Sequence, residues 1–475
     1  MPRLPALLIF LAGIAAAAPA GAQIPAPVAR ALATAGIGED SVGLYVRDAA
    51  NPKPLASHNA DRAFNPASAI KLLTTYAALE ILGPAYGWTT TVLAAGPVAD
   101  EVLSGDLILR GGGDPKLTLE AFWLLLRQAR ARGIRDIRGD LVLDRGFFAL
   151  DETDPSRFDG EPTRPYNTPP DALLVSFKAV RLSFVPDAER GRVDVIAQPA
   201  LSNVRVINEV KLDNAPCGDF RARMQVTPQV EASGVRLVAT GLYSRQCGES
   251  ERSYSVLTHQ DFVGTLFRDL WKELGGTLGG TVRTATAPAG ARVIAVAPSI
   301  AVSEAIRDIN KYSNNVMARQ LYLTIGAAAG GAPATPDKAD RAIRNWLAQK
   351  GLRLPELVLE NGSGLSRVER ISARGLSELL AAAWRSPVMP ELIASMPVVG
   401  VDGTLRKRAQ NSDFAGQAHI KGGTLTGVRA MSGYVLDAAG RRTIVTLLVN
   451  HPKVTNANIQ PAFDALLAWT HARRE

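Results

Sequence analysis

A serine and a lysine three positions apart, at the predicted start of a helix, constrain the fold of this chain more than any other feature. The segment 65–80 reads Asn-Pro-Ala-Ser-Ala-Ile-Lys-Leu-Leu-Thr-Thr-Tyr-Ala-Ala-Leu-Glu, which places Ser68 and Lys71 about one turn apart. Pro66 is typical of a helix start, and Gly83 is typical of a helix end. Because side chains at i and i+3 share a helix face, we expect the two to meet near the positive end of the helix dipole. A hydroxyl beside a neutral lysine amine is a workable nucleophile–base pair.

Two further motifs follow in the chain, which matters because a single Ser-x-x-Lys pair arises easily by chance. Residues 313–315 read Ser-Asn-Asn at a predicted loop-to-helix junction, and residues 421–424 read Lys-Gly-Gly-Thr at the predicted end of a strand. Each has an ordinary structural alternative, a helix cap for the first and a strand end with a bulge for the second. The three motifs in this order, each on the expected element, favour a catalytic site.

Together the motifs assign a chemical role to each polar group. Ser68 would attack an acyl carbon, and Lys71 would take its proton. A second ammonium at Lys421 would lower the pKa of Lys71 by like-charge repulsion, helped by burial. Ser313 can relay a proton to the departing amine, and Asn315 can hold a substrate amide. The backbone N–H groups of Ser68 and Thr424 can form an oxyanion hole. Lys421 and Thr424 can bind a substrate carboxylate.

Strand patterns occur at both ends of the chain. Residues 40–64 are predicted to form a hairpin, and residues 417–421, 428–436 and 443–450 are predicted strands. An amphipathic helix is predicted over 456–473. Strands at both ends with helices between them predict one sheet built from both termini.

The stretch between the first two motifs has a different character. Residues 90–290 are predicted to be an insertion of two units, with helices at 117–132 and 258–274 and a strand-rich part at 178–255. The Ala/Gly-rich run 327–335 is predicted to be a loop.

The first residues are typical of a secretory signal. Arg3 supplies the charge, residues 4–18 form a short apolar stretch, and Ala20-Gly21-Ala22 resembles a cleavage site. The net charge of +8 falls to +7 without the signal, and no basic-aromatic stripe indicates nucleic-acid binding. We expect an exported, soluble protein, with loose association with the membrane as the alternative.

Cysteine and metal-binding patterns are sparse. Cys217 and Cys247 are the only cysteines, and an even pair in an exported protein favours a disulfide, worth about 3–4 kcal/mol on the chain-entropy model. The alternative is two buried free thiols. No His-Glu-x-x-His motif or Cys/His cluster indicates a metal site.

The three motifs resemble the Ser-x-x-Lys, Ser-x-Asn and Lys-Thr-Gly signature of penicillin-binding proteins and class A β-lactamases. The chain most resembles the D-alanyl-D-alanine carboxypeptidase/endopeptidases, the class C low-molecular-mass penicillin-binding proteins of the penicillin-binding protein 4 type. The long separation of Ser68 from Ser313 matches that family, whereas class A β-lactamases space their motifs closely. Four further segments carry the resemblance: 105–115 (GDLILRGGGDP), 166–173 (YNTPPDAL), 361–367 (NGSGLSR) and 401–405 (VDGTL).

The resemblance implies an α/β (α+β) fold, a β-lactamase/transpeptidase-like serine hydrolase domain with an all-helical part and two inserted, mostly β domains. The expected boundaries are 1–22 for the signal, 23–90 plus 291–475 for the catalytic domain, 91–156 plus 256–290 for the first inserted domain, and 157–255 for the second.

The resemblance also implies an activity. We expect hydrolysis of the terminal D-Ala-D-Ala bond of peptidoglycan stem peptides and of meso-diaminopimelate–D-Ala cross-links in the periplasm, through an acyl-enzyme on Ser68. Penicillins would acylate the same serine, and no metal or cofactor is expected. Arg367 is the candidate contact for the carboxylate of the donor side chain; its alternative is an ordinary surface arginine. The sequence favours neither carboxypeptidase nor endopeptidase activity and indicates no oligomeric state.

One position departs from the family pattern, because Gly422 stands where the family usually has threonine. Gly423 and Thr424 retain the rest of the motif. We expect weaker binding of the substrate carboxylate, not loss of activity. The alternatives are a β-lactamase, for which the sequence offers no evident deacylating glutamate, and a non-catalytic peptidoglycan- or β-lactam-binding protein. A generic serine esterase is disfavoured, because no Gly-x-Ser-x-Gly motif is present.

Overall fold

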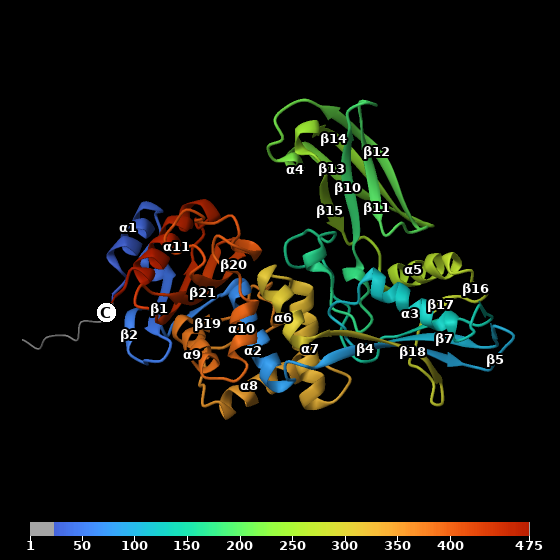
Figure 1. The fold of residues 1–475 in the computed structure, drawn as a ribbon, viewed down its shortest axis with the longest axis horizontal. Helices are drawn as coiled ribbons and strands as arrows, with labels where there is room; N and C mark the ends of the chain where they lie inside the picture. The colour runs from blue at the N-terminus through green and yellow to red at the C-terminus, as the bar shows by residue number, and fades with distance from the viewer. Residues whose placement is uncertain (1–22, 475) are drawn as a thin grey trace, which may run out of the picture.

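The two ends of the chain meet in one antiparallel five-stranded sheet, which confirms the prediction of a sheet built from both termini. The computed structural model describes residues 23–474, so the predicted export signal at 1–22 lies outside the described residues. The strand order is β2-β1-β22-β21-β20, and Figure 1 shows blue N-terminal and red C-terminal segments side by side. The strands are β1 (Val42–Asp48), β2 (Pro54–His58), β20 (Ala418–Leu425), β21 (Val428–Leu436) and β22 (Arg442–Asn450).

Helices cover both faces of this sheet, so its central strands are almost continuously buried. Along β22, Val445 and Leu447 pack in the core formed with α1 and α11, while Ile444 and Leu448 pack in the core formed with α2 and α9. A run of apolar residues is therefore the expected pattern for such a strand. The helices are α1 (Ala26–Thr34), α11 (Asn456–His471), α2 (Lys71–Ile81) and α9 (Ala373–Trp384).

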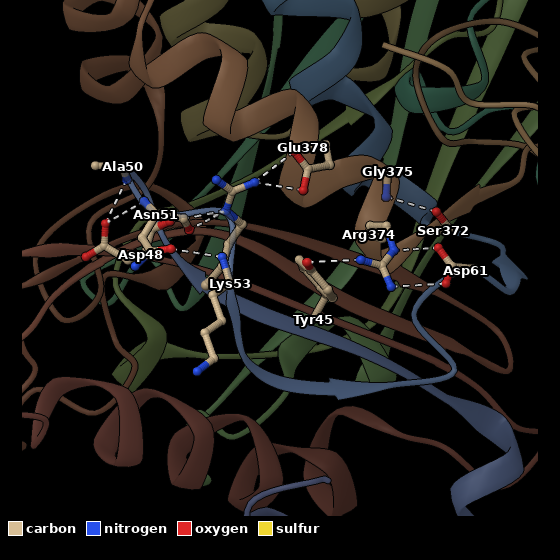
Figure 2. Close-up of polar contacts among 11 residues, drawn as sticks. Tyr45, Asp48, Ala50, Asn51, Lys53, Asp61, Ser372, Arg374, Gly375 and Glu378 are labelled. Carbon is tan, nitrogen blue, oxygen red and sulfur yellow. Dashed lines mark hydrogen bonds and ion pairs between the residues drawn. The ribbon is translucent and has the colours of Figure 1, made fainter. Parts of the chain in front are cut away.

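Three polar contacts join helix α9 to β1 and to the turn after β2 (Figure 2). Nη1 of Arg47, a buried side chain on β1, donates to both carboxylate oxygens of Glu378 on α9, at 2.7 and 2.8 Å. Arg374, also on α9, contacts Asp61 at 2.5 Å and the hydroxyl of Tyr45 at 3.1 Å. These contacts orient α9, which packs against one face of the sheet.

A helical part separates this sheet from the inserted region. The sequence predicts a loop for residues 327–335, but helix α7 extends through Gly330, so the first half of that prediction is wrong. The alanines in this run favour the helix, because alanine is the strongest helix former. The remaining elements here are α6 (Val302–Lys311), α7 (Asn315–Gly330), α8 (Pro336–Gln349), α10 (Met389–Ser395), β3 (Ala63–Phe64) and β19 (Ile371–Ser372).

The first part of the insertion contains two small sheets and two helices. A five-stranded sheet has the order β17-β9-β7-β4-β18, and a four-stranded sheet has the order β16-β8-β6-β5. The elements are β4 (Gly87–Ala95), β5 (Val98–Ala99), β6 (Val102–Leu103), β7 (Asp106–Gly111), β8 (Asp136–Ile137), β9 (Leu141–Asp144), β16 (Thr277–Leu278), β17 (Val282–Thr284), β18 (Arg292–Ala301), α3 (Leu119–Ala131) and α5 (His259–Glu273).

Strand β4 spans the predicted domain boundary at 90/91, and β18 begins just after the predicted boundary at 290/291. The register pairs Arg292 with Ala94 at one end and Ala301 with Gly87 at the other. By strand pairing, β18 is thus part of the inserted sheet, although the sequence boundary assigned it to the catalytic domain. The strand that leads out of the catalytic domain, β4, pairs with the strand that leads back into it, β18. Sequence patterns do not reveal pairing between strands so far apart in the chain.

The second part of the insertion is a six-stranded sheet, coloured green in Figure 1. Its order is β13-β14-β12-β11-β10-β15. The disulfide favoured by the sequence is present between Cys217 and Cys247, at one end of this sheet. The elements are β10 (Val180–Asp187), β11 (Arg192–Gln198), β12 (Val204–Asp213), β13 (Met224–Glu231), β14 (Gly234–Ser244), β15 (Ser250–Tyr254) and α4 (Phe220–Arg223).

Candidate active site

Ser68 and Lys71 are in contact, as the sequence predicts, but the local structure differs. Ser68 lies in a 3₁₀ turn (Ala67–Ile70), and Lys71 is the first residue of α2. Because a 3₁₀ turn repeats every three residues, it also aligns i with i+3. The Lys71 Nζ donates to the Ser68 Oγ at 3.0 Å. The turn is fixed by Asn65, whose side chain accepts from the Ala67 backbone N–H at 2.8 Å.

The amine of Lys71 is completely buried and lies among neutral acceptors. It donates to the Asn315 Oδ1 at 2.6 Å and to the backbone carbonyl of Ser363. Among the described residues, no carboxylate forms an ion pair with it. Burial lowers the pKa of Lys71 well below its usual value, repulsion from Lys421 lowers it further, and Glu369 opposes both. The sequence interpretation attributed the lowered pKa of Lys71 mainly to repulsion from Lys421, but burial is the larger cause.

The three residues of the Ser-Asn-Asn motif have different roles in the structure. The Asn314 side chain caps α7 by accepting from the Met317 backbone N–H at 3.0 Å, so the helix-cap alternative is right for the middle residue. Asn315, the next residue, reaches Lys71. Ser313 adopts a positive φ of 57°, an uncommon conformation outside glycine, and its hydroxyl is held by Lys421. The flanking residues therefore remain available for the site.

Lys421 lies inside β20 and not at the end of a strand, because the strand continues to Leu425. Its Nζ donates to the Ser313 Oγ at 2.9 Å and to the Gly422 carbonyl at 2.7 Å. Burial lowers the pKa of Lys421 to about 7. The register between β20 and β21 is continuous, so the bulge considered as an alternative is absent.

Gly423 brings the edge of β20 directly against the turn that carries the serine. A Cβ at this position would lie 2.5 Å from the carbonyl oxygen of Pro66 and 3.0 Å from the backbone nitrogen of Ser68. Only glycine permits this approach. The close contact places the chain at 423–424 beside the Ser68 amide, where an oxyanion site requires its two donors to converge.

Arg367 lies at the same cavity, as the sequence predicts. Its guanidinium is 4.6 Å from the ring centroid of Phe158, and its Nη1 donates to the Thr426 carbonyl at 3.3 Å. The side chain is exposed, so its charge remains accessible to a ligand.

A cavity of about 800 Å³ unites these groups. Its lining includes every predicted site residue except Lys71, which lies beneath Ser68. The predicted residues on its wall are Ser68, Ser313, Asn315, Arg367, Lys421, Gly423 and Thr424.

The sequence interpretation missed three cavity residues and one buried acid. Phe158, Asp159 and Tyr166 reach the cavity from the loop that leads into the six-stranded sheet; only Tyr166 stood in a motif that could have indicated it. Burial opposes ionisation of Asp159, but hydrogen bonds from Tyr166 and Asn167 lower its pKa overall.

The buried acid is Glu369. Its Oε1 accepts the backbone N–H groups of residues 360, 361 and 362 at 3.2, 3.0 and 2.8 Å, which fixes the loop that presents the Ser363 carbonyl to Lys71. A lone glutamate after a serine-rich loop carries no sequence signal for this role.

Two negative observations concern the described residues 23–474. No group of three or more His, Cys, Asp or Glu side chains there is arranged to hold a metal ion. No helix in the same range is long and apolar enough to cross a lipid bilayer.

The arrangement can support acyl transfer without a histidine. One buried amine is in contact with the Ser68 hydroxyl and can accept its proton once neutral. The second amine is in contact with Ser313, at the same cavity. A nucleophile, a base and a separate proton path are thus present within one site.

The chain is similar to known proteins over most of its length. Residues 25–470 match the model of the D-Ala-D-Ala carboxypeptidase 3 (S13) family. A D-alanyl-D-alanine carboxypeptidase of Actinomadura sp. (strain R39) is 29% identical over 441 residues, which is 90% of this chain and 81% of the relative.

Solved structures show the same fold. Penicillin binding protein 4 (dacB) of Haemophilus influenzae matches with a TM-score of 0.76 at 22% identity, covering 93% of this chain and 99% of that chain. Bd3459, a predatory peptidoglycan endopeptidase of Bdellovibrio bacteriovorus, matches with a TM-score of 0.51 at 15% identity, covering 90% and 92%.

Proposed function

The chain belongs to the D-Ala-D-Ala carboxypeptidase 3 (S13) family, and from that premise we propose that it hydrolyses the terminal D-Ala-D-Ala bond of peptidoglycan stem peptides through an acyl-enzyme on Ser68. One observation carries the proposal: the Lys71 amine is buried, has a lowered pKa and lies 3.0 Å from the Ser68 Oγ. An ammonium would hold its proton, whereas a neutral amine can take one from the hydroxyl.

The reaction proceeds in two balanced halves. In the first, the Ser68 Oγ bonds to the carbonyl carbon and its proton passes to Lys71. The carbon–nitrogen bond then breaks, and the leaving amine receives a proton through Ser313. In the second half, water bonds to the acyl carbon and gives a proton to Lys71, the bond between that carbon and the Ser68 Oγ breaks, the acid is released, and Lys71 returns the proton to the Ser68 Oγ.

Backbone and side-chain donors stabilise the charges that develop. The backbone N–H groups of Ser68 and Thr424 form the oxyanion hole, in which one donor is typically worth about 3–4 kcal/mol. Lys421 and Thr424 bind the terminal carboxylate of the substrate, and Asn315 holds a substrate amide. No metal or cofactor takes part.

The proposal extends to cross-linked peptides and penicillins. Meso-diaminopimelate–D-Ala cross-links present the same type of acyl carbon, and a structural relative is named a peptidoglycan endopeptidase. Another is named a penicillin binding protein, and penicillins would acylate Ser68. Arg367, whose guanidinium lies beside the Phe158 ring, would contact the carboxylate of the donor side chain. The protein would act in the periplasm after export by residues 1–22.

Two alternatives are less well supported. A class A β-lactamase uses a glutamate to hold its deacylating water, and the one carboxylate that lines the cavity among the described residues, Asp159, is hydrogen-bonded to Tyr166 and Asn167. A non-catalytic binder would be expected to lose the nucleophile or its base, yet both serine–lysine contacts are intact.

Labelling with a fluorescent penicillin tests the proposal. The wild-type protein should form a stable adduct, and Ser68→Ala and Lys71→Ala should not. Lys53→Ala is the matched control, because this exposed lysine lies between β1 and β2 and does not line the cavity, so its variant should label like the wild type. Rapid turnover without a lasting adduct would favour a β-lactamase. Absence of acylation in the wild type would favour a non-catalytic binder.

A further inference from the structure

Glu369 anchors a loop of the active site but also acts against the base of that site. Its Oε1 accepts the backbone N–H groups of residues 360–362, and the same loop presents the Ser363 carbonyl to Lys71. Burial has the largest effect on the pKa of Lys71 and lowers it, whereas the carboxylate of Glu369 raises it by stabilising the ammonium. A lysine that must accept a proton therefore needs a group that offsets this carboxylate.

Arg319 lies on the face of α7 that is turned towards this loop. Asn315, one turn earlier on α7, accepts from the Lys71 Nζ at 2.6 Å. Tyr322, one turn later, packs against the loop, because a Cβ at Gly362 would lie 2.8 Å from the Tyr322 Cδ2. Residues at i, i+4 and i+7 share a helix face, so Arg319 lies between these two contacts.

The guanidinium of Arg319 brings a positive charge into this buried region. Its Nε is buried without a hydrogen-bond partner among residues 23–474, and the same is true of the Glu369 Oε2. Burial lowers the pKa of Arg319, whereas the carboxylates of Glu369 and Glu360 raise it. Glu360 is exposed, so solvent and salt screen its charge, but Glu369 is completely buried. Glu369 is therefore the main negative charge that acts on Arg319.

Three charged side chains act on Lys71 in addition to burial. Lys421 on β20 lowers the pKa of Lys71, Glu369 raises it, and Arg319 on α7 lowers it. Tyr322, the other titratable group on this face of α7, stays neutral because burial raises the pKa of its phenol. Without Arg319, repulsion from Lys421 would be the only charge that opposes the buried carboxylate.

We propose that Arg319 is a positioning residue for the serine–lysine pair: its guanidinium offsets the carboxylate of Glu369, which can then anchor the loop without stabilising the ammonium of Lys71. The inference rests on the proposed function, because it requires that neutral Lys71 takes the proton of Ser68. Arg319 does not line the cavity, so it acts through Lys71 and not on the substrate. An arginine with a purely structural role would support the fold but would not change the titration of the base.

The pH dependence of acylation by a fluorescent penicillin tests this role. Arg319→Gln removes the charge, so the acid limb of the profile should shift about one pH unit higher, the scale of one nearby charge. At a given pH on that limb the variant should react about tenfold more slowly than the wild type. Arg319→Lys retains the charge, and its acid limb should lie close to that of the wild type.

Arg341→Gln is the matched control, because it removes one arginine from the exposed surface of α8. Its acid limb should lie where that of the wild type does. An equal shift in Arg341→Gln and Arg319→Gln would show a general effect of net charge and would overturn the inference.

A double variant separates the charge effect from a loss of stability. Arg319→Gln combined with Glu369→Gln removes both buried charges, so its acid limb should return close to that of the wild type, above that of Glu369→Gln alone. The inference is overturned if folded Arg319→Gln keeps its acid limb in place, even with a lower melting temperature, or if the double variant titrates like Glu369→Gln. Failure of the wild type to acylate refutes the proposed function, whereas normal acylation with an unmoved limb refutes the role of Arg319 alone.

Discussion

Lys71 and Lys421 each direct a buried amine at a serine hydroxyl, at 3.0 and 2.9 Å, within one cavity. Neither forms an ion pair with a carboxylate among the described residues. Both pKa values are lowered by burial, and that of Lys71 is lowered further by its neighbour. An amine whose pKa is lowered in this way becomes neutral, and able to accept a proton, at a lower pH than a solvent-exposed lysine.

The first prediction concerns the pH dependence of hydrolysis. The rate should rise with pH as Lys71 loses its proton, at a pH well below the usual lysine range. Binding of the substrate carboxylate should weaken above about pH 7, as Lys421 loses its charge. A bell-shaped profile of kcat/KM on a pentapeptide is therefore expected. A profile that still rises at pH 10 would contradict the assignment of Lys71 as base.

The second prediction is a gain of stability when Lys421 is replaced. The pKa of Lys421 is about 7 in the folded protein, below the ordinary value of 10.5, so the unfolded chain binds more protons between these values. This group therefore lowers the stability of the wild type progressively as the pH falls from 10.5 towards 7. Lys421→Met should remove that penalty.

Chemical denaturation at several pH values measures this effect. Lys421→Met should be more stable than the wild type by about 1–4 kcal/mol at pH 7, with the difference shrinking towards pH 10. Peptide hydrolysis should be lost in the same variant. Equal stability at pH 7 would mean that the hydrogen bonds to Ser313 and Gly422 offset the cost of burial.

The sequence predicted the parts of the site whose geometry depends on residues only a few positions apart in the chain. Ser68 and Lys71 meet because any tight helical turn aligns i with i+3, whether it is an α-helix or a 3₁₀ turn. Asn315 could be placed because it begins a helix after a turn. A sheet shared by both termini was predictable because strand patterns occur at both ends of the chain, whereas the pairing of β1 with β22 is known only from the structure.

The remaining features depend on contacts between distant segments, which no local pattern encodes. Asp159 lines the cavity although it is far from Ser68, Ser313 and Lys421 along the chain. Pairing of β4 with β18 joins residues separated by the whole insertion. Gly422 was recognised as a departure from a motif, but its location opposite Met431, with an empty space beside it, required the structure.

Glu369 provides a third prediction, because it combines a structural and an electrostatic role. Its Oε1 holds three backbone N–H groups, while its Oε2 is buried without a hydrogen-bond partner. Glu369→Gln retains an oxygen for the three donors and removes the negative charge. The charge raises the pKa of Lys71, so its removal should shift the acid limb of the acylation profile to lower pH.

The matched variant for this test is Glu369→Leu, which removes both functions. It should lower the melting temperature and the acylation rate together, because the loop that carries the Ser363 carbonyl loses its anchor. In Glu369→Gln the acid limb of the acylation profile should shift to lower pH, and acylation should be retained. If the acid limb stays in place in Glu369→Gln, the carboxyl is neutral in the native protein and acts only as an anchor.

The last prediction compares two ion pairs that join α9 to the β1 side of the catalytic sheet (Figure 2). Arg47 is 2% exposed, and removal of its partner by Glu378→Ala leaves a buried guanidinium without its charged acceptor. We expect a loss of about 1.5–3 kcal/mol in the free energy of unfolding. Asp61→Ala breaks the neighbouring pair with Arg374, but the Asp61 side chain is 74% exposed, so the loss should stay below about 1 kcal/mol. Urea denaturation of both variants measures the difference, and equal losses would show that burial of the arginine does not set the strength of this contact.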